Sequence, residues 1–260
     1  MEMIIHLPGV RILKPFRLHV YEITHLPFET FSELDADWAD EWYYEKANPV
    51  FAIRRDLEYE PSDKVRQNLI MLIYYAILLG SGNEYPNPML SVTYFQDDDH
   101  QTRRYVGAAD RSFLLHNNYE CNISHSQTSS IQEIYTLCQN IAVQWNDPIF
   151  LLLNILGDIY SQNVSQQYAS LPLMVALETY LIGTEPKAKI ISRMIDAVNN
   201  RLFIDASSSI REIYSWRSDI LHGRETKFIN ANRIFLRLKD LSYALTIQAL
   251  KDRGEPNDSI

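Results

Sequence analysis

The chain has 260 residues, 46% of them hydrophobic and 22% charged, which is an ordinary composition for a soluble globular protein. Its two cysteines exclude a disulfide framework, and its longest apolar run, residues 70–80, is too short to span a membrane, so we expect a cytoplasmic protein with no membrane partner. The net charge of −9 argues against a uniformly basic surface that binds nucleic acid.

Residues 1–124 are predicted to form a mixed α/β region. Alternating, β-branched and aromatic residues indicate short strands, which lie at residues 3–12, 16–23, 50–59, 89–96 and 101–107. Residues 62–79 carry apolar side chains on one helical face and are predicted to form a helix. This region has 11 basic and 19 acidic side chains, a balance of −8, and we expect it to be sensory or regulatory.

Residues 125–260 are predicted to form a helical bundle with a short C-terminal tail. Helical periodicity recurs in six segments separated by Asn, Asp, Gly, Pro and Ser, at residues 131–145, 148–160, 168–182, 187–203, 207–222 and 231–251. Short connections between helices are typical of a bundle. The predicted fold class is therefore α+β, with a mixed region followed by an all-α bundle. Residues 185–253 carry 13 basic and 8 acidic side chains, which permits a phosphate-bearing ligand.

An arginine interrupts the apolar stripe of the predicted helix at residues 207–222. The stripe repeats at helical spacings and consists of Ile210, Ile213, Tyr214, Ile220 and Leu221. Arg217 falls in its middle. A guanidinium at such a position costs free energy unless it meets an anion, a partner chain or a ligand.

The same helix is predicted to end at His222 and Gly223, because glycine often ends a helix in a left-handed conformation. An imidazole beside a fixed cation suits acid–base chemistry at a phosphodiester, in which the guanidinium orients the phosphate. Residues five positions apart lie about 140° apart around a helix, so one copy makes a poor clamp, whereas two copies could build a shared cleft. The simpler interpretation is a helix end capped by His222, with Arg217 paired to Glu178 or to another acid.

The spacing of Arg217 and His222 is by itself a weak signal. The segment RSFLLH at residues 111–116 repeats the pattern of RSDILH at residues 217–222, but it follows a predicted strand and lacks a glycine after the histidine. Only the second segment closes a periodic helix. The context of the motif therefore carries the prediction.

The run of residues 173–223 resembles the HEPN domain family, and most closely its Apea-like branch. The matching residues are Ala176-Leu177-Glu178 in one helix, followed by the helix at residues 187–203 and then the pattern Tyr-x-x-Arg-Ser-x-x-x-His-Gly, which is formed by Tyr214, Arg217, Ser218, His222 and Gly223. The resemblance covers about residues 126–252. It implies an all-helical bundle that forms a homodimer through the helix carrying Arg217 and His222.

The resemblance also implies a function. Many HEPN domains are metal-independent endoribonucleases of prokaryotic toxin and antiviral defence systems, and we expect RNA as the partner and no metal or cofactor. Carried over to this sequence, His222 is the catalytic acid or base and Arg217 the catalytic phosphate contact. Tyr214, Ser218, Asp219 and Glu178 are the supporting residues. The alternatives are a non-catalytic HEPN module that binds nucleotide, RNA or protein, and a purely structural bundle.

Overall fold

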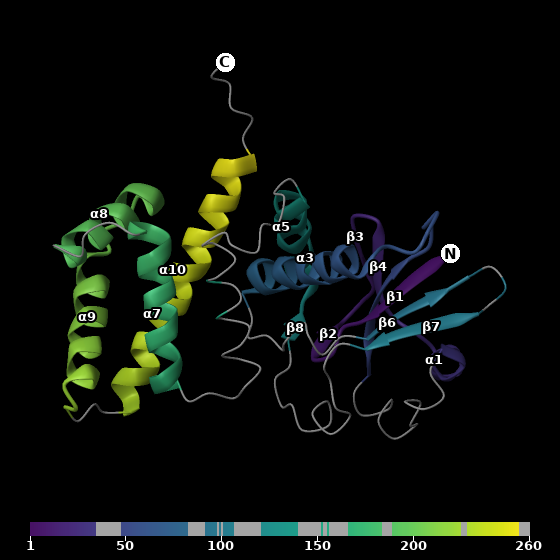
Figure 1. The fold of residues 1–260 in the computed structure, drawn as a ribbon, viewed down its shortest axis with the longest axis horizontal. Coiled ribbons are helices and arrows are strands. Elements are labelled where there is room, and N and C mark those ends of the chain that lie inside the picture. The colour runs from purple at the N-terminus through teal and green to yellow at the C-terminus, as the bar shows by residue number, and fades with distance from the viewer. Residues whose placement is uncertain are drawn as a thin grey trace, which may run out of the picture. The chain divides into compact units, whose positions relative to one another are not determined.

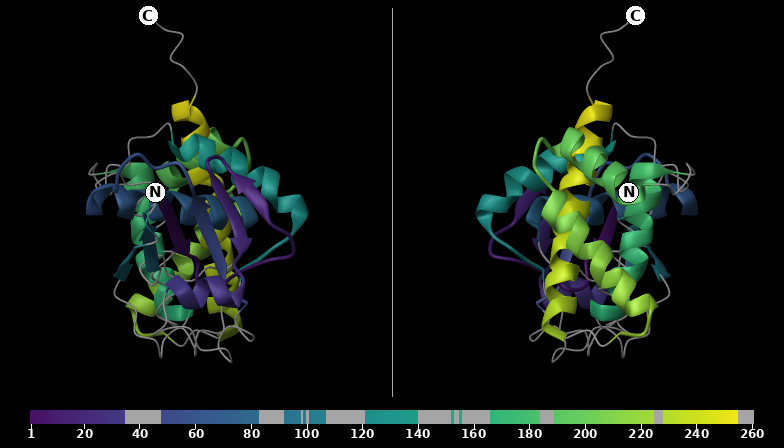
Figure 2. Two further views of the ribbon diagram at one scale, coloured as in Figure 1. Left: turned by 90° about the vertical axis from the view of Figure 1, so that its right-hand side faces the viewer. Right: turned by 90° about the vertical axis from the view of Figure 1, so that its left-hand side faces the viewer.

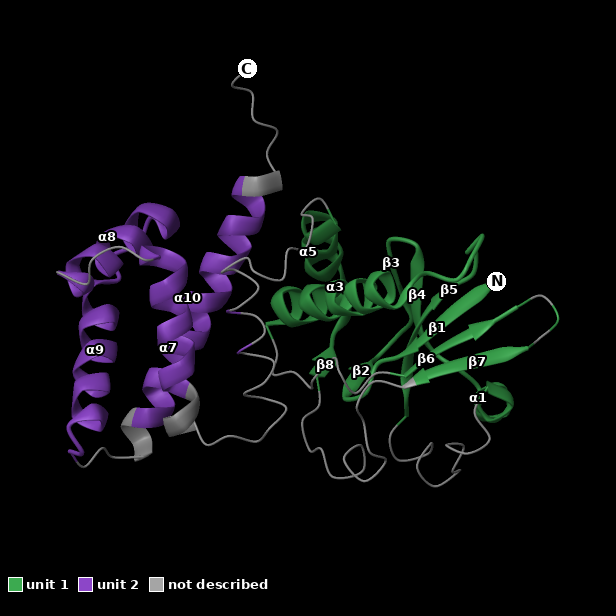
Figure 3. Ribbon diagram, in the orientation of Figure 1, with its two compact units in different colours: residues 1–140 green, residues 141–260 purple. Residues whose placement is uncertain are grey.

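The computed structural model describes residues 1–34, 48–82, 92–97, 99, 101–106, 121–139, 152, 155, 166–183, 189–224 and 228–254. The chain divides into two compact units, residues 1–140 and 141–260, which Figure 3 colours separately. The described residues form seven α-helices and a mainly antiparallel sheet, which confirms the predicted α+β class.

A six-stranded antiparallel sheet with the order β3-β4-β5-β1-β6-β7 forms the centre of the first unit (Figure 1). In that order the strands are Phe16–Leu18, Tyr21–His25, Val50–Arg54, Glu2–His6, Val92–Gln96 and Thr102–Val106. The central strands β5, β1 and β6 are apolar along most of their length because both of their faces are covered. Among the described residues, a separate pair of parallel strands is formed by β2 (Val10–Ile12) and β8 (Cys121–Ile123).

Helices cover both faces of the sheet. On one face, Phe31 and Leu34 of α1 (Phe28–Leu34) join a core cluster with Ile4, Ile53 and Tyr94. On the other face lie α3 (Asp63–Ser81) and α5 (Thr128–Gln139). The Arg66 guanidinium of α3 lies 3.9 Å from the ring centroid of Tyr105 on β7, and Tyr135 of α5 meets Tyr21 of β4 edge-on at 6.3 Å between ring centroids.

The helix α5 belongs to the first unit, although we expected a boundary at 124/125 that places it in the bundle. Gly80 of α3 allows the two helices to touch, because a Cβ atom there would lie 2.5 Å from the Cα atom of Ile131. The Gln127 side chain donates to the Ser81 carbonyl at 2.6 Å, and the His19 amide donates to Gln132 Oε1 at 2.9 Å. The division between the compact units therefore lies at 140/141.

The segment at residues 16–23 also differs from its prediction. We expected one strand, and the structure has two, β3 and β4, which pair antiparallel with Arg17 opposite Glu22. His19 lies in the turn between them with a φ of 55°. The alternation shifts by one position at this turn, because Leu18 pairs with Tyr21, and the adjacent apolar residues Val20 and Tyr21 mark that shift in the sequence.

The second unit consists, in its described elements, of the helices α7 (Gln166–Ile182), α8 (Ile190–Leu202), α9 (Ser207–Leu221) and α10 (Phe228–Gly254). Helices α7 and α10 lie side by side (Figures 1 and 2), and both α8 and α9 contact α10. Leu173 and Leu177 of α7, Ile213 of α9, and Phe235 and Leu238 of α10 are buried. The predicted helix at residues 148–160 lies outside the described residues except for Leu152 and Ile155.

Among the residues that the structure describes, no helix combines the length and the apolar content that crossing a bilayer requires.

Candidate functional site

The C-terminal end of α9 carries the candidate site, and backbone hydrogen bonds define it. Gly223 adopts a left-handed φ of 66°, as predicted. Its amide donates to the Ile220 carbonyl at 3.0 Å, and the Arg224 amide donates to the Asp219 carbonyl at 2.8 Å. These two bonds form a Schellman motif, in which glycine satisfies the last carbonyls of the helix.

His222 is the residue at which α9 ends. Its backbone amide donates to the Ser218 carbonyl at 3.0 Å, and its side chain is exposed. The backbone alone makes the contacts that stop the helix, so the imidazole ring is left at the surface.

The start of α9 is held by the turn that follows α8. The helix begins at Ser207, whose amide donates to Asp205 Oδ1 at 3.0 Å. Hydrogen bonds from the Ser207 side chain and then from its amide lower the pKa of Asp205. Asn199 of α8 accepts a hydrogen bond from the Ala206 amide at 2.8 Å. The short connection therefore fixes the position of α9 against α8.

Arg217 is paired with Glu178, as the simpler interpretation predicts. Arg217 Nη1 donates to Glu178 Oε1 at 3.1 Å, and the Tyr214 hydroxyl donates to the same oxygen at 2.7 Å. The side chain of Glu178 is 10% exposed and that of Arg217 26% exposed. The structure thus brings together three of the predicted residues, one from α7 and two from α9.

The protonation of this cluster follows from its burial. Removal from water raises the pKa of Tyr214 far above its usual value, the hydrogen bond to the Glu178 carboxylate acts in the same direction, and Arg217 opposes both. Tyr214 therefore remains a hydrogen-bond donor at neutral pH. A guanidinium has five N–H donors, so the bond to Glu178 leaves Arg217, with its partly exposed side chain, other donors for an anion.

The remaining predicted residues, Ser218 and Asp219, do not join this cluster. Asp219 Oδ1 accepts a hydrogen bond from Arg224 Nη1 at 3.0 Å. Ser218 is exposed on another side of α9. Arg217 reaches toward α7, whereas His222 lies at the helix end about 140° away around the axis, so a single chain does not converge both groups on one phosphate.

Two ion-pair partners in this unit escaped prediction. Arg224 follows the helix-ending glycine and pairs with Asp219 across the helix end, a contact that the Asp-x-x-x-Gly-Arg sequence could have indicated. Glu212 of α9 pairs with Arg233 and Arg237 of α10. Arg233 and Arg237 are one helical turn apart, but nothing in the sequence identifies which acid faces them.

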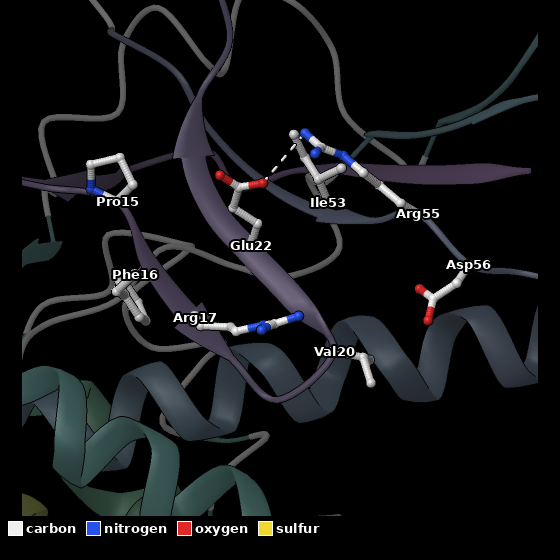
Figure 4. Close-up of a pocket in the computed structure, with 8 residues that line it drawn as sticks. All are labelled: Pro15, Phe16, Arg17, Val20, Glu22, Ile53, Arg55 and Asp56. Atoms are coloured by element: carbon white, nitrogen blue, oxygen red, sulfur yellow. Dashed lines mark ion pairs between the residues drawn. The ribbon is translucent and has the colours of Figure 1, made fainter.

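A pocket of about 600 Å³ lies in the first unit (Figure 4). Its charged lining residues are Arg17, Glu22, Arg55 and Asp56, all of them exposed, and its buried lining residue, Ile53, is apolar. Arg55 contacts Glu22 and Glu2, each at 3.4 Å. The four lining charges cancel and none of them is held in place by burial, so the pocket indicates no particular ligand.

In the part of the chain that the structure describes, no three or more His, Cys, Asp or Glu side chains gather closely enough to hold a metal ion.

Comparisons with known proteins gave no match to any family model, curated protein or solved structure. Membership of the HEPN family therefore remains a prediction that rests on the residues of α7 and α9 quoted above.

Proposed function

We propose that the chain is a metal-independent endoribonuclease of the HEPN type that acts as a homodimer in the cytoplasm, in prokaryotic defence or toxin-like growth control. The observation that carries the proposal is the end of α9. Its His222 imidazole is exposed. Five residues earlier, the guanidinium of Arg217 is partly exposed and is held in place by neighbouring side chains.

The chemistry assigns one role to each of these groups. The imidazole of His222 accepts the proton of the RNA 2′-hydroxyl, whose oxygen then attacks the adjacent phosphorus. The bond from phosphorus to the 5′ oxygen breaks, and that oxygen takes a proton from an imidazolium. The products are a 2′,3′-cyclic phosphate and a 5′-hydroxyl end. Arg217 stabilises the negative charge that develops on the phosphate oxygens.

A second copy supplies the convergence that one chain lacks. The exposed side of α9 carries Ser208, Arg211, Ser215 and Ser218, so its small residues Ser215 and Ser218 let another helix approach most closely in the C-terminal half. Leu221 near the end of that helix is 63% exposed and offers apolar area to a partner. Two α9 helices that meet near their C-terminal ends, around Ser218 and Leu221, bring the Arg217 and His222 side chains of both copies toward one groove.

The second candidate function is a non-catalytic module that binds nucleotide, RNA or protein. The Glu178–Arg217 ion pair favours it, because a carboxylate that already neutralises the guanidinium weakens its action on a transition state.

The test compares the full-length wild type with Arg217→Ala and His222→Ala in an RNA-cleavage assay that contains EDTA. We expect each variant to lose at least about 100-fold in rate, since acid–base groups contribute about 10²–10⁴-fold. The matched controls are Arg111→Ala and His116→Ala, from the repeat of the motif that lies outside the described residues, and they should cleave like the wild type. Circular dichroism and light scattering confirm folding and dimerisation.

The outcomes separate the two functions. Wild-type cleavage by folded His222→Ala rules out the proposed nuclease site. RNA binding without cleavage in the wild type supports the non-catalytic module. If two copies share the groove, a mixture of the two inactive variants should regain part of the activity that neither has alone.

A further inference from the structure

The carboxylate of Glu178 already pairs with the guanidinium that a substrate phosphate would bind through its remaining donors. Glu178 Oε1 accepts from Arg217 Nη1 at 3.1 Å and from the Tyr214 hydroxyl at 2.7 Å. Glu178 is buried on α7, and so it cannot rotate into water without breaking both contacts. A phosphate that approaches Arg217 therefore meets a fixed negative charge of its own sign.

From this geometry we propose that the fixed Glu178 carboxylate competes with the RNA phosphate for Arg217 and so restrains the site until the guanidinium is released to the phosphate. The inference rests on the proposed function and adds a mode of regulation to the same site. It assigns to Tyr214 the role of a positioning residue, which holds the carboxylate without touching the substrate.

The proposal predicts effects of opposite sign for two conservative substitutions. Glu178→Gln keeps the size of the side chain and an acceptor oxygen for Tyr214, but it removes the charge that competes with phosphate. Tyr214→Phe removes one of the two donors and leaves the buried carboxylate more dependent on Arg217. A purely structural role for the cluster predicts instead that both substitutions weaken the site.

The first measurement is the dissociation constant of the full chain for a fluorescent single-stranded RNA, with His222→Ala present in every variant to prevent cleavage. We expect Glu178→Gln to tighten binding about tenfold and Tyr214→Phe to weaken it about threefold, since charge juxtaposition at an interface affects affinity on this scale. Glu212→Gln is the matched control. This substitution removes one negative charge from α9, but Glu212 pairs with Arg233 and Arg237 and not with Arg217. The affinity for RNA should therefore stay within about twofold of the wild type.

The salt dependence identifies Arg217 as the group that is released. One additional phosphate contact on single-stranded RNA steepens the slope of log Kd against log salt by about 0.7. Glu178→Gln should show that change, and Glu212→Gln should not. In an Arg217→Ala background Glu178→Gln should have no effect. Unchanged or weaker binding by folded Glu178→Gln overturns the proposal.

A second readout requires no RNA. The rate at which phenylglyoxal modifies Arg217, followed by peptide mass spectrometry, should rise in Glu178→Gln and fall in Tyr214→Phe. If these rates change as expected but no variant binds RNA, the restraint is supported and the proposed nuclease is wrong. If RNA is bound and cleaved but neither the rates nor the affinities respond, the nuclease stands and the restraint is wrong.

Discussion

Replacing Arg217 by alanine is expected to destabilise the second unit as well as to remove a phosphate contact. The substitution leaves the buried Glu178 carboxylate with Tyr214 as its donor from α9. A hydrogen bond to a charged group contributes about 1.5–3 kcal/mol. Because the Arg217 side chain is 26% exposed and water screens part of the interaction, we expect a loss of about 1–2 kcal/mol in the free energy of unfolding.

A double-mutant cycle measures this loss. The variants are Arg217→Ala, Glu178→Gln and their combination, and the coupling between the two residues should be about 1 kcal/mol. Hydrogen exchange of amides in α7 and α9 is the suitable assay, because it reports the opening of these helices even if the two compact units unfold separately. The combined variant should recover most of the stability that Arg217→Ala loses, since no charge then remains buried beside Tyr214.

Two outcomes would refute this reasoning. If Arg217→Ala changes the exchange of α7 and α9 by less than about 0.3 kcal/mol, the carboxylate does not depend on the guanidinium. If the losses of the two single variants add without coupling, each side chain acts through other contacts. The size of this loss of stability also matters for the cleavage assay, which must be run well below the unfolding temperature of Arg217→Ala.

Two further predictions concern the first unit. Gly80→Ala should destabilise the first unit by about 1–3 kcal/mol in urea unfolding, because the new methyl group would lie 2.5 Å from Ile131 Cα and 2.6 Å from Ile131 N. This clash outweighs the gain of up to about 1 kcal/mol in helix propensity. A variant as stable as the wild type would disprove the close approach of the two helices. Burial lowers the pKa of His6 from 6.5 to about 4, so the unfolded chain takes up a proton at a higher pH than the folded chain does. The free energy of unfolding of this unit should therefore fall by about 3 kcal/mol as the pH falls from 6.5 to 4. His6→Leu should remove that part of the pH dependence, and identical pH profiles for the two proteins would contradict the assignment.

The elements that the sequence predicts well are those whose local pattern suffices. The central strands consist of apolar runs. Strands β6 and β7, which pair antiparallel, lie within the predicted strands at residues 89–96 and 101–107. The predicted helix at residues 207–222 matches α9, Ser207–Leu221, and Gly223 ends it as expected. The predicted stripe is correct for Ile210, Ile213 and Tyr214, which are buried, but wrong for Leu221, which is 63% exposed.

Contacts between distant segments escape this kind of prediction. The side chains Ile131, Ile134 and Tyr135 give α5 an apolar face, but they do not reveal that the face packs on α3 at Gly80. The parallel pair of β2 and β8 joins Val10 to Cys121 across more than a hundred residues. The acid that pairs with Arg217 could be named from the sequence only as one possibility among several, because the choice depends on how α7 packs against α9.

The fold accounts for one half of the proposed site and leaves the other half unexplained. Arg217 has a structural role, because it neutralises a buried carboxylate and links α9 to α7. His222 has no such role among the described contacts, since backbone bonds from its own amide, Gly223 and Arg224 end the helix and would do so with another side chain at this position. Loss of activity in Arg217→Ala therefore has two possible causes, folding or chemistry. Loss of activity in His222→Ala has only the chemical one, so the nuclease proposal depends on the histidine more than on the arginine.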